Sequence, residues 1–414
     1  MVPSPRPAPA SDLGGQAIGR TRARGRTVTP SATSHPKQSD ISSIFRPWRL
    51  GPLEIPNRLV RSATWEGLST DSGAPTRRLI DLTADLARGR VGLIIAGAAY
   101  VQREGRYASR ETGMDRDGLI APLSHLCDAV HRAKGVLAAQ LSHVGSSLPP
   151  EVVEEKTGPY GPSAVPLDPV CESPVRALCR TQIDDLVEDY ARAATRARRA
   201  GFDAVQIHAA HGGLLNQFLS PARNRREDAY GGSLPRRARF LYEAYEAVRG
   251  AVGPSFPVFV KMSAHDGYAD GVQPVEAALV AAELGRLGID AIEVSAGTPE
   301  GARRGGWDHI MPAPIPEGRF FDYALTIKDA VRCPVISVEG WRDPLRIAEA
   351  LERIDAVSLC RPFIREPHLA ARWRAGDLTP ATCISCNKCL DLIVDRGLGC
   401  IFHKTARGRA VVGA

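Results

Sequence analysis

The feature that most constrains the fold is a regular alternation of short apolar runs with amphipathic segments. Eight apolar runs, each bounded by turn residues, have the pattern of buried strands. They are Asn57–Ser62, Val91–Ala96, Val136–Leu141, Ala204–Ile207, Val258–Met262, Ala291–Ser295, Val335–Val338 and Ala356–Leu359. Eight strand-helix units in about 320 residues predict an α/β fold of the closed (β/α)8 TIM-barrel type rather than an open sheet.

Helical patterns connect the strands. The expected helices are Thr76–Arg88, Leu119–Ala133, a run capped by Thr181 that continues to Arg199, Arg236–Val248, Val275–Leu287, Tyr323–Val331 and Leu345–Glu352. A short hairpin, Trp48–Ile55, precedes the barrel and turns at Gly51-Pro52. We therefore expect a disordered basic tail over residues 1–44, a barrel over 45–375 and a C-terminal cysteine-rich segment over 376–414.

The basic charge belongs mainly to the tail. Of the net charge of +7, residues 1–39 carry +5, which leaves +2 for the rest of the chain. The tail is rich in Pro, Ser, Gly and Arg and cannot bury a core. The body therefore does not look like a nucleic-acid-binding surface. Because no run of about eighteen apolar residues occurs, we expect no membrane span either.

Four of the nine cysteines fall close together near the C-terminus, at Cys383, Cys386, Cys389 and Cys400. Such clustering favours a metal over disulfides and indicates a reducing cytoplasm. Four thiolates at this spacing suit a [4Fe–4S] cluster or a tetrahedral zinc ion, and a third alternative is that they bind no metal.

Two histidines stand where the fourth strand ends. His208 and His211 lie just after the apolar run Ala204–Ile207, and a Gly-Gly pair follows them. In a barrel, the loops after the strands converge on one mouth, and catalytic residues lie there. The pair is therefore predicted to belong to an active site rather than to the core.

Other strands carry polar residues that burial alone does not explain. Gln140 ends the third strand, and Lys261 lies inside the apolar run of the fifth. A buried lysine needs an anionic or polar partner, and a buried amide needs hydrogen bonds. Loops after the seventh and eighth strands of barrels commonly bind phosphate, which draws attention to Gly340 and Arg361.

The stretch Gly201–Ser233 carries a long pattern, G-F-D-x-x-x-I-H-x-A-H-G followed by F-L-S-P and N-x-R-x-D-x-Y-G-G-S. It resembles the old yellow enzyme family of FMN-dependent NADH:flavin oxidoreductases, and the resemblance extends from about Phe45 to Cys400. It implies an FMN cofactor and NAD(P)H as the electron donor. The small residues Ala63, Thr64 and Ala98 match positions that contact the flavin.

The resemblance also assigns roles to the polar residues. Gln140 matches the amide that pairs with the pyrimidine edge of the flavin, and Lys261 matches the cation near flavin N1 and O2. Gly340, Cys360 and Arg361 match the phosphate-binding residues, although the family usually has glycine where Cys360 stands. His208 and His211 match the pair that binds the carbonyl oxygen of an unsaturated substrate.

One difference from the family pattern limits how much of the family's reaction can be expected of this chain. Family reductases usually have a proton-donating tyrosine two residues after the second histidine, where this chain has Gly213. Tyr100, Tyr160, Tyr268 or water could supply the proton instead. The primary expectation is reduction of a carbonyl-conjugated alkene, and the alternative is oxidative dehydrogenation or demethylation of an amine or methylated small molecule.

The cysteine segment is similar to the iron–sulfur segment of the 2,4-dienoyl-CoA reductase and trimethylamine dehydrogenase branch. This similarity leaves open an electron-transfer partner, or a flavin and iron–sulfur electron-transfer subunit without a substrate of its own. A zinc hydrolase using His208 and His211 is a further alternative, but no H-E-x-x-H pattern supports it. The substrate, the choice of NADH or NADPH and the oligomeric state stay open.

Overall fold

The computed structural model describes residues 40–147, 159–165 and 175–402. The expected tail lies outside these residues as far as Ser39, and so does much of the proline-rich loop after the third strand. The last residues of the expected tail are described. They enter a short 3-10 helix, Ser42–Phe45, in which Ile44 is fully buried. Folded chain therefore begins earlier than the sequence indicated.

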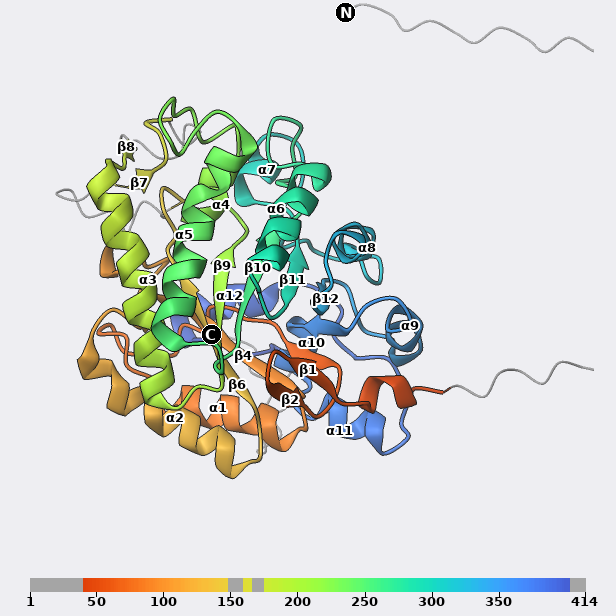
Figure 1. The fold of residues 1–414 in the computed structure, drawn as a ribbon. Helices are drawn as coiled ribbons and strands as arrows, with labels where there is room; N and C mark the ends of the chain where they lie inside the picture. The colour runs from red at the N-terminus through yellow and green to blue at the C-terminus, as the bar shows by residue number, and fades with distance from the viewer. Residues whose placement is uncertain (1–39, 148–158, 166–174, 403–414) are drawn as a thin grey trace, which may run out of the picture. The chain divides into compact units, whose positions relative to one another are not determined.

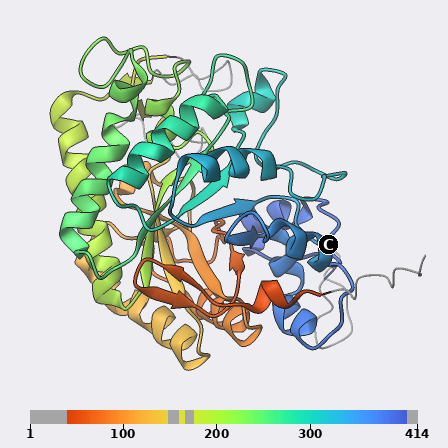
Figure 2. The same cartoon turned by 45° about the vertical axis from the view of Figure 1, so that its right-hand side comes forward.

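The described strands form a closed parallel barrel (Figures 1 and 2). Its members are β3 (Leu59–Arg61), β4 (Leu93–Tyr100), β6 (Leu137–Ser142), β9 (Ala204–Ala209), β10 (Val258–Ser263), β11 (Ile292–Ser295), β12 (Val335–Val338) and β13 (Ala356–Leu359). The barrel closes because β13 pairs with β3, which in turn pairs with β4. The predicted (β/α)8 fold is confirmed.

Helices surround the barrel, as Figure 1 shows. The long ones are α1 (Arg77–Arg88), α2 (Ile120–Arg132), α3 (Arg180–Ala200), α5 (Leu234–Val252), α6 (Pro274–Arg286) and α8 (Phe321–Ala330). Shorter ones are α4 (Leu214–Leu219), α7 (Pro299–Arg303), α9 (Pro344–Ala350), α10 (Arg361–Arg365), α11 (Leu369–Arg374) and α12 (Lys388–Arg396). No helix in the described ranges is both long and apolar enough to cross a bilayer.

The start of α3 differs from the prediction. Thr181 was expected to cap this helix, but the helix begins at Arg180 and Cys179 is its N-cap. The Gln182 side chain accepts a hydrogen bond from the Cys179 backbone N–H at 2.9 Å. A glutamine at this position supplies the returning half of a capping box, and it moves the helix start ahead of the threonine.

The predicted hairpin is confirmed as β1 (Trp48–Leu50) paired with β2 (Leu53–Ile55). Trp48, Leu50 and Ile55 belong to one buried apolar cluster with inward-facing residues of the barrel strands, such as Phe259. This cluster closes one end of the barrel with apolar side chains. Three short strands, β5 (Thr112–Gly113), β7 (Tyr160–Gly161) and β8 (Arg176–Ala177), lie in connecting loops.

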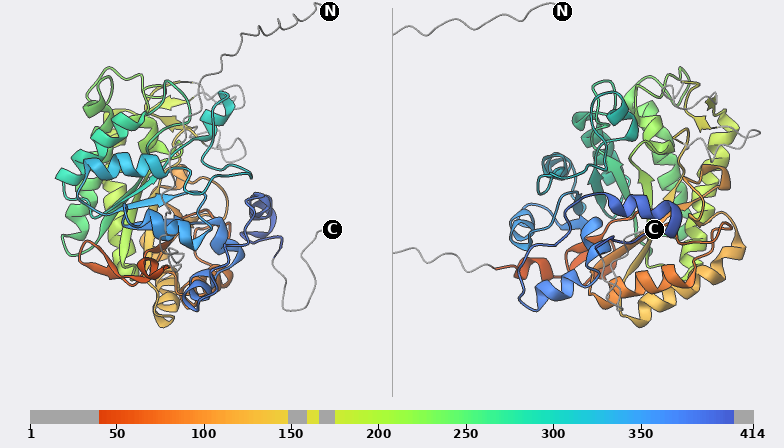
Figure 3. Two further views of the ribbon diagram at one scale, coloured as in Figure 1. Left: turned by 90° about the vertical axis from the view of Figure 1, so that its right-hand side faces the viewer. Right: turned by 180° about the vertical axis from the view of Figure 1, so that it is seen from behind.

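The other end of the barrel carries the cysteine-rich segment. Figure 3 shows α12 lying across the barrel when the molecule is seen from behind. Arg110 donates to the carbonyl of Ile393 in α12 at 2.8 Å, and the Leu398 N–H donates to the Glu66 carbonyl at 2.7 Å. The described part of this segment is thus attached to loops that follow the first and second barrel strands.

Candidate functional site

A cavity of about 640 Å³ opens where the barrel strands end. Residues from separate strand ends and from α12 line it. Among the residues singled out from the sequence, the cavity brings together Ala63, Thr64, Ala98, Gln140, His208, His211, Lys261, Cys360, Arg361 and Cys389. Gly340, Cys383, Cys386 and Cys400 are not among its lining residues. The carboxyl-terminal mouth of the barrel is therefore the candidate active site.

The two histidines stand at the end of β9 with their ring centroids 5.4 Å apart. Nε2 of His211 lies 2.7 Å from Ser295 Oγ, and the His211 backbone N–H donates to Ser263 Oγ. Burial, with a smaller effect of Lys261, lowers the pKa of His208 to about 3. Burial, followed by the charges of His309 and Lys261, also holds the pKa of His211 well below its usual value. Both rings are neutral near pH 7.

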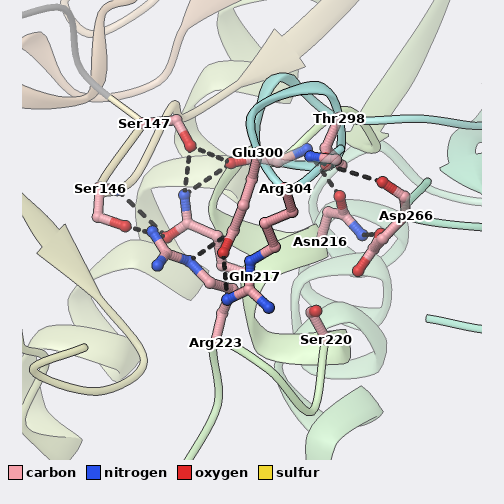
Figure 4. A network of polar contacts seen from close by, with 12 residues as sticks. Ser146, Ser147, Asn216, Gln217, Ser220, Arg223, Asp266, Thr298, Glu300 and Arg304 are labelled. Carbon is pink, nitrogen blue, oxygen red and sulfur yellow. Dashed lines mark hydrogen bonds and ion pairs between the residues drawn. The ribbon is translucent and has the colours of Figure 1, made fainter. Parts of the chain in front are cut away.

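The turn that carries the histidines is held by a polar network, of which Figure 4 shows Asn216, Gln217 and Asp266. Gly212, at φ +78°, donates its N–H to Asn216 Oδ1, and its carbonyl accepts from the Gln217 amide at 2.6 Å. Asn216 in turn donates to Asp266 at 3.0 Å. Burial raises the pKa of Asp266 to about 6. Because glycine tolerates positive φ, Gly212 permits the tight turn that this network fixes.

Lys261 is buried in β10, as the sequence indicated, and the partners it requires are present. Its Nζ donates to Ser62 Oγ at 2.8 Å and lies 3.5 Å from Glu293 Oε1. Gln140 donates to Gln206 Oε1 at 2.7 Å. These bonds use one of the amide's groups and two of the ammonium's three N–H bonds, so both residues keep polar capacity on the cavity side.

A β-bulge in β4 places the small residue Ala98 beside the cavity. The register between β4 and β6 shifts between Ala96 and Ala98. At Gly97, a Cβ would lie 1.9 Å from the Glu66 carboxylate, so glycine is required there. The bulge directs Ala98 into the cavity, where its small side chain leaves room for a planar ring.

The predicted phosphate loops are only partly assembled around the cavity. Gly340 has φ +86°, and a Cβ there would lie 2.1 Å from the Pro316 carbonyl oxygen. Arg361 and Cys360 reach the cavity, but the guanidinium of Arg361 is ion-paired with Glu339 and donates to Met311 O. A carboxylate therefore already occupies one side of the arginine that was expected to meet a phosphate.

Two residues that were not predicted from the sequence lie against the histidine pair. His309 stacks on His211 with centroids 4.0 Å apart, and Asp308 Oδ1 lies 2.5 Å from His309 Nδ1. Burial opposes ionisation of Asp308, but the hydrogen bond and charge of His309 hold its pKa below the usual value. Their position in the loop after β11 was the available signal, because every loop after a strand faces the same mouth.

The tyrosines proposed as substitute proton donors are not at the site. Tyr100, Tyr160 and Tyr268 do not line the cavity. Tyr100 is almost fully buried, and Tyr268 lies 3.3 Å from Ser220 behind the histidine turn. The aromatic wall consists instead of Trp65 and Tyr107, which meet edge-on at 5.8 Å.

The four clustered cysteines line a second, small cavity beside Arg361. Cys389 contributes to both cavities. Burial raises the pKa of Cys389 to about 12 and also raises that of Cys383. All cysteines in the described ranges are free thiols, and no group of three or more Cys, His, Asp or Glu side chains there has a metal-binding arrangement.

The donor set of the main cavity fits an FMN. Trp65 Nε1 and His208 Nδ1 are buried and have no hydrogen-bond partner among residues 40–147, 159–165 and 175–402. The cavity combines these groups with a buried cation, an amide and small side chains. A flavin offers a large apolar ring with one polar edge, which such a lining can accommodate.

A parallel (β/α)8 barrel whose mouth has this lining suits a flavin-dependent oxidoreductase. The chain belongs to the NADH:flavin oxidoreductase / NADH oxidase family, which matches it over residues 43–378. The resemblance inferred from the sequence is thereby confirmed. The chain is an FMN-dependent oxidoreductase, and its family supports NAD(P)H as the reductant.

Individual relatives cover different shares of the chain. A 4,4'-dithiodibutanoate disulfide reductase from Rhodococcus erythropolis is 32% identical over 85% of this chain and 93% of its own length. An NADH oxidase from Thermoanaerobacter brockii is 33% identical over 83% of this chain, which spans only 53% of that relative. The structure of morphinone reductase in complex with tetrahydroNAD has a TM-score of 0.69 at 30% identity, covering 81% of this chain and 91% of that one.

Proposed function

We propose that this enzyme uses FMN and NAD(P)H to reduce an alkene conjugated to a carbonyl group. The observation that carries the proposal is the pair of partly buried, neutral imidazoles, His208 and His211, in one cavity with Lys261 and Gln140. Neutral donors that line a cavity can stabilise an oxygen on which negative charge develops. The family match supports the flavin chemistry.

Lys261, Gln140, Ala63, Thr64 and Ala98 would hold the flavin ring. Arg361, Cys360 and the Gly340 turn would hold the phosphate once Arg361 exchanges its ion pair with Glu339 for the incoming anion. When bound, FMN supplies the hydride that reduces the alkene. Lys261 would stabilise the negative charge that reduction places on the pyrimidine edge.

His208 and His211 bind and orient the substrate carbonyl. A neutral imidazole carries one N–H, so each ring can donate one hydrogen bond to the carbonyl oxygen. Ser295 contacts Nε2 of His211 and restricts the orientation of that ring. The amide of the reduced nicotinamide can use the same two donors when it occupies the cavity.

We assign the proton that completes the reduction to His309. Gly213 provides no acid, and His309 lies in the cavity wall against His211. The Asp308 carboxylate lies beside Nδ1 and orients the ring, so that its other nitrogen can pass a proton to the substrate.

We further propose that Cys383, Cys386, Cys389 and Cys400 bind a [4Fe–4S] cluster, with zinc as the alternative occupant. Four thiols lining one small cavity support the proposal. Because burial raises the pKa of Cys383 and Cys389, metal binding would have to displace their protons. A cluster there would face an electron-transfer partner from the outside of the barrel mouth. Free clustered thiols fit a cytoplasmic protein.

The test begins with an absorption spectrum of the protein purified without oxygen, together with iron and zinc analysis. NADH or NADPH should then bleach the flavin, and 2-cyclohexenone should restore its colour. An amine that bleaches the flavin would favour the oxidative alternative. The Rhodococcus relative makes 4,4'-dithiodibutanoate a second oxidant to try.

Variants locate the chemistry in the cavity. His208→Ala with His211→Ala should abolish reoxidation by the enone and leave FMN bound. His125→Ala, at an exposed position on α2, is the matched control and should behave as wild type. Loss of FMN in the double variant would show that the pair holds the flavin and not the substrate. A colourless protein that cannot take up FMN would overturn the proposal.

A further inference from the structure

A fully buried carboxylate lies beneath the cavity, in the interior of the barrel. Glu293 on β11 is 0% exposed. Its Oε1 accepts hydrogen bonds from Ser62 Oγ and Ser358 Oγ, each at 2.7 Å, and its Oε2 accepts from Gln206 Nε2 at 2.8 Å. The donors come from strands on several sides of the barrel. A side chain with this many partners, out of reach of water, has a fixed orientation.

Glu293 is ionised in this setting. Burial raises its pKa, but the nearby charge of Lys261 and the three donors lower it by more, so the pKa lies below the usual value. Lys261 Nζ is 3.5 Å from Oε1. An ionised carboxylate accepts hydrogen bonds and donates none, so every neighbour must direct a proton toward it.

This requirement propagates to Gln140. Gln206 must direct its NH2 group at Glu293, and its Oε1 then accepts from the Gln140 amide at 2.7 Å. Gln140 therefore uses an N–H inward. Its Oε1 has no hydrogen-bond partner among the described residues, and Gln140 lines the cavity. The series of hydrogen bonds from Glu293 through Gln206 to Gln140 thus leaves Gln140 Oε1 as an acceptor at the cavity.

A second branch runs to Lys261. Ser62 donates its only hydroxyl proton to Glu293, so its oxygen is left to accept from Lys261 Nζ at 2.8 Å. An ammonium has three N–H bonds. Lys261 also donates to Glu293 Oε1 at 3.5 Å, so it keeps one donor for the cavity while its charge is partly balanced by Glu293.

We infer that Glu293 is a positioning residue that sets the hydrogen-bond polarity of the flavin site, with an acceptor at Gln140 and a donor at Lys261. The inference rests on the proposed binding of FMN in this cavity. The flavin edge presents the complementary groups, an N3–H donor flanked by carbonyl oxygens and, next to them, N1. Both branches start at this one buried acid, so a change at Glu293 should reach both of them.

The test replaces the acid with its neutral isostere, Glu293→Gln. An amide both donates and accepts, so Gln206 and Gln140 are free to invert and to direct an NH2 group into the cavity. Bound FMN should then lose its N3 proton at a lower pH, by about one unit, which is a tenfold change in the ionisation constant. Absorption spectra of bound oxidised FMN measured at increasing pH report this ionisation without turnover.

The same variant should raise the midpoint potential of the flavin. Removing the anion beside Lys261 leaves its positive charge less balanced, which favours the reduced, anionic flavin. A tenfold preference corresponds to about 30 mV for a two-electron couple. Adding Lys261→Met to Glu293→Gln should abolish the rise.

Controls separate polarity from packing. Ser358→Ala removes a donor to the same oxygen but lies on neither branch, so both readouts should stay at wild-type values. Gln206→Leu breaks only the Gln140 branch, so it should shift the N3 ionisation and leave the potential unchanged. Gln206→Leu also keeps the inference testable if Glu293→Gln does not fold.

The outcomes distinguish the inference from the proposed function. A wild-type protein that binds no FMN would refute the proposed function. A wild type that binds FMN, with a Glu293→Gln variant showing neither the N3 shift nor the rise in potential, would refute the role of Glu293. Shifts of equal size in Ser358→Ala would also refute it, because they would reflect general loosening of the barrel interior.

Discussion

Restoring a tyrosine at Gly213 tests the assignment of the proton donor. Gly213 is the N-cap of α4 and has φ −65°, a conformation open to any residue. A Cβ there would lie 3.3 Å from Ala210 O, 3.4 Å from His143 O and 3.5 Å from His208 Cδ2. These contacts are tight but need shifts of only a few tenths of an ångström. Gly213 lines the cavity, so the new phenol can enter it.

The expected magnitudes favour a measurable catalytic effect over a loss of folding. Replacing a glycine N-cap costs up to about 1 kcal/mol, and removing glycine from the unfolded chain returns about 0.4–1 kcal/mol. General acid catalysis is worth about 10²–10⁴-fold. His309→Gln should therefore slow reoxidation of the reduced enzyme by about 10²-fold or more. Gly213→Tyr in that background should recover about tenfold or more.

The assay is anaerobic stopped-flow mixing of NADH-reduced enzyme with 2-cyclohexenone, monitored at the flavin absorption band. His309→Gln with Gly213→Phe is the matched control, since it fills the same space without an acid and should stay slow. Flavin content confirms that each variant is folded. The assignment is refuted if His309→Gln reoxidises at the wild-type rate, or if tyrosine and phenylalanine at position 213 give the same rate.

Three further predictions concern a buried acid, the histidine pair and the cysteine cluster. Burial raises the pKa of Glu111 from 4.5 to about 8, so the unfolded chain ionises first and the wild type loses stability as pH rises through this window. Denaturant titrations should show that the free energy of unfolding of Glu111→Gln, taken relative to that of wild type, is about 3 kcal/mol higher at pH 8 than at pH 5. An equal difference between the two proteins at both pH values would contradict this. Because the pKa of His208 is about 3, reoxidation rates should show no titration of this group between pH 5 and 8, as a rate–pH profile would reveal. Cys386→Ser should lose metal, measured by iron and zinc analysis, while retaining FMN. Equal metal content in the variant and the wild type would contradict the proposal that the cysteines are metal ligands.

The strands of the barrel were predictable because apolar runs punctuated by turn residues repeat along the chain. Lys261 was identifiable for a related reason, since a cation inside an apolar run must meet a polar or anionic group in the barrel interior. The histidine pair combined a strand end with a Gly-Gly turn. Each of these signals is local, and short-range patterns are what a sequence displays directly.

Contacts between distant segments were not predictable in the same way. His309 stacks on His211 from a loop without periodicity, so nothing near it in the sequence indicates the contact. Glu293 lies in a short buried strand, and its role depends on donors in or directly after three other strands. The ion pair of Glu339 with Arg361 likewise requires the barrel to close before its two partners meet.

The central claim is that a flavin in this cavity passes electrons from a nicotinamide to an activated alkene. The most direct measurement is a sequential anaerobic titration of the purified protein, monitored by its absorption spectrum. We predict that one equivalent of NADH or NADPH bleaches bound FMN and that 2-cyclohexenone then restores it, with stoichiometric cyclohexanone as the product. A flavin that NADH and NADPH both leave oxidised, or a reduced flavin that the enone leaves bleached, would contradict the account.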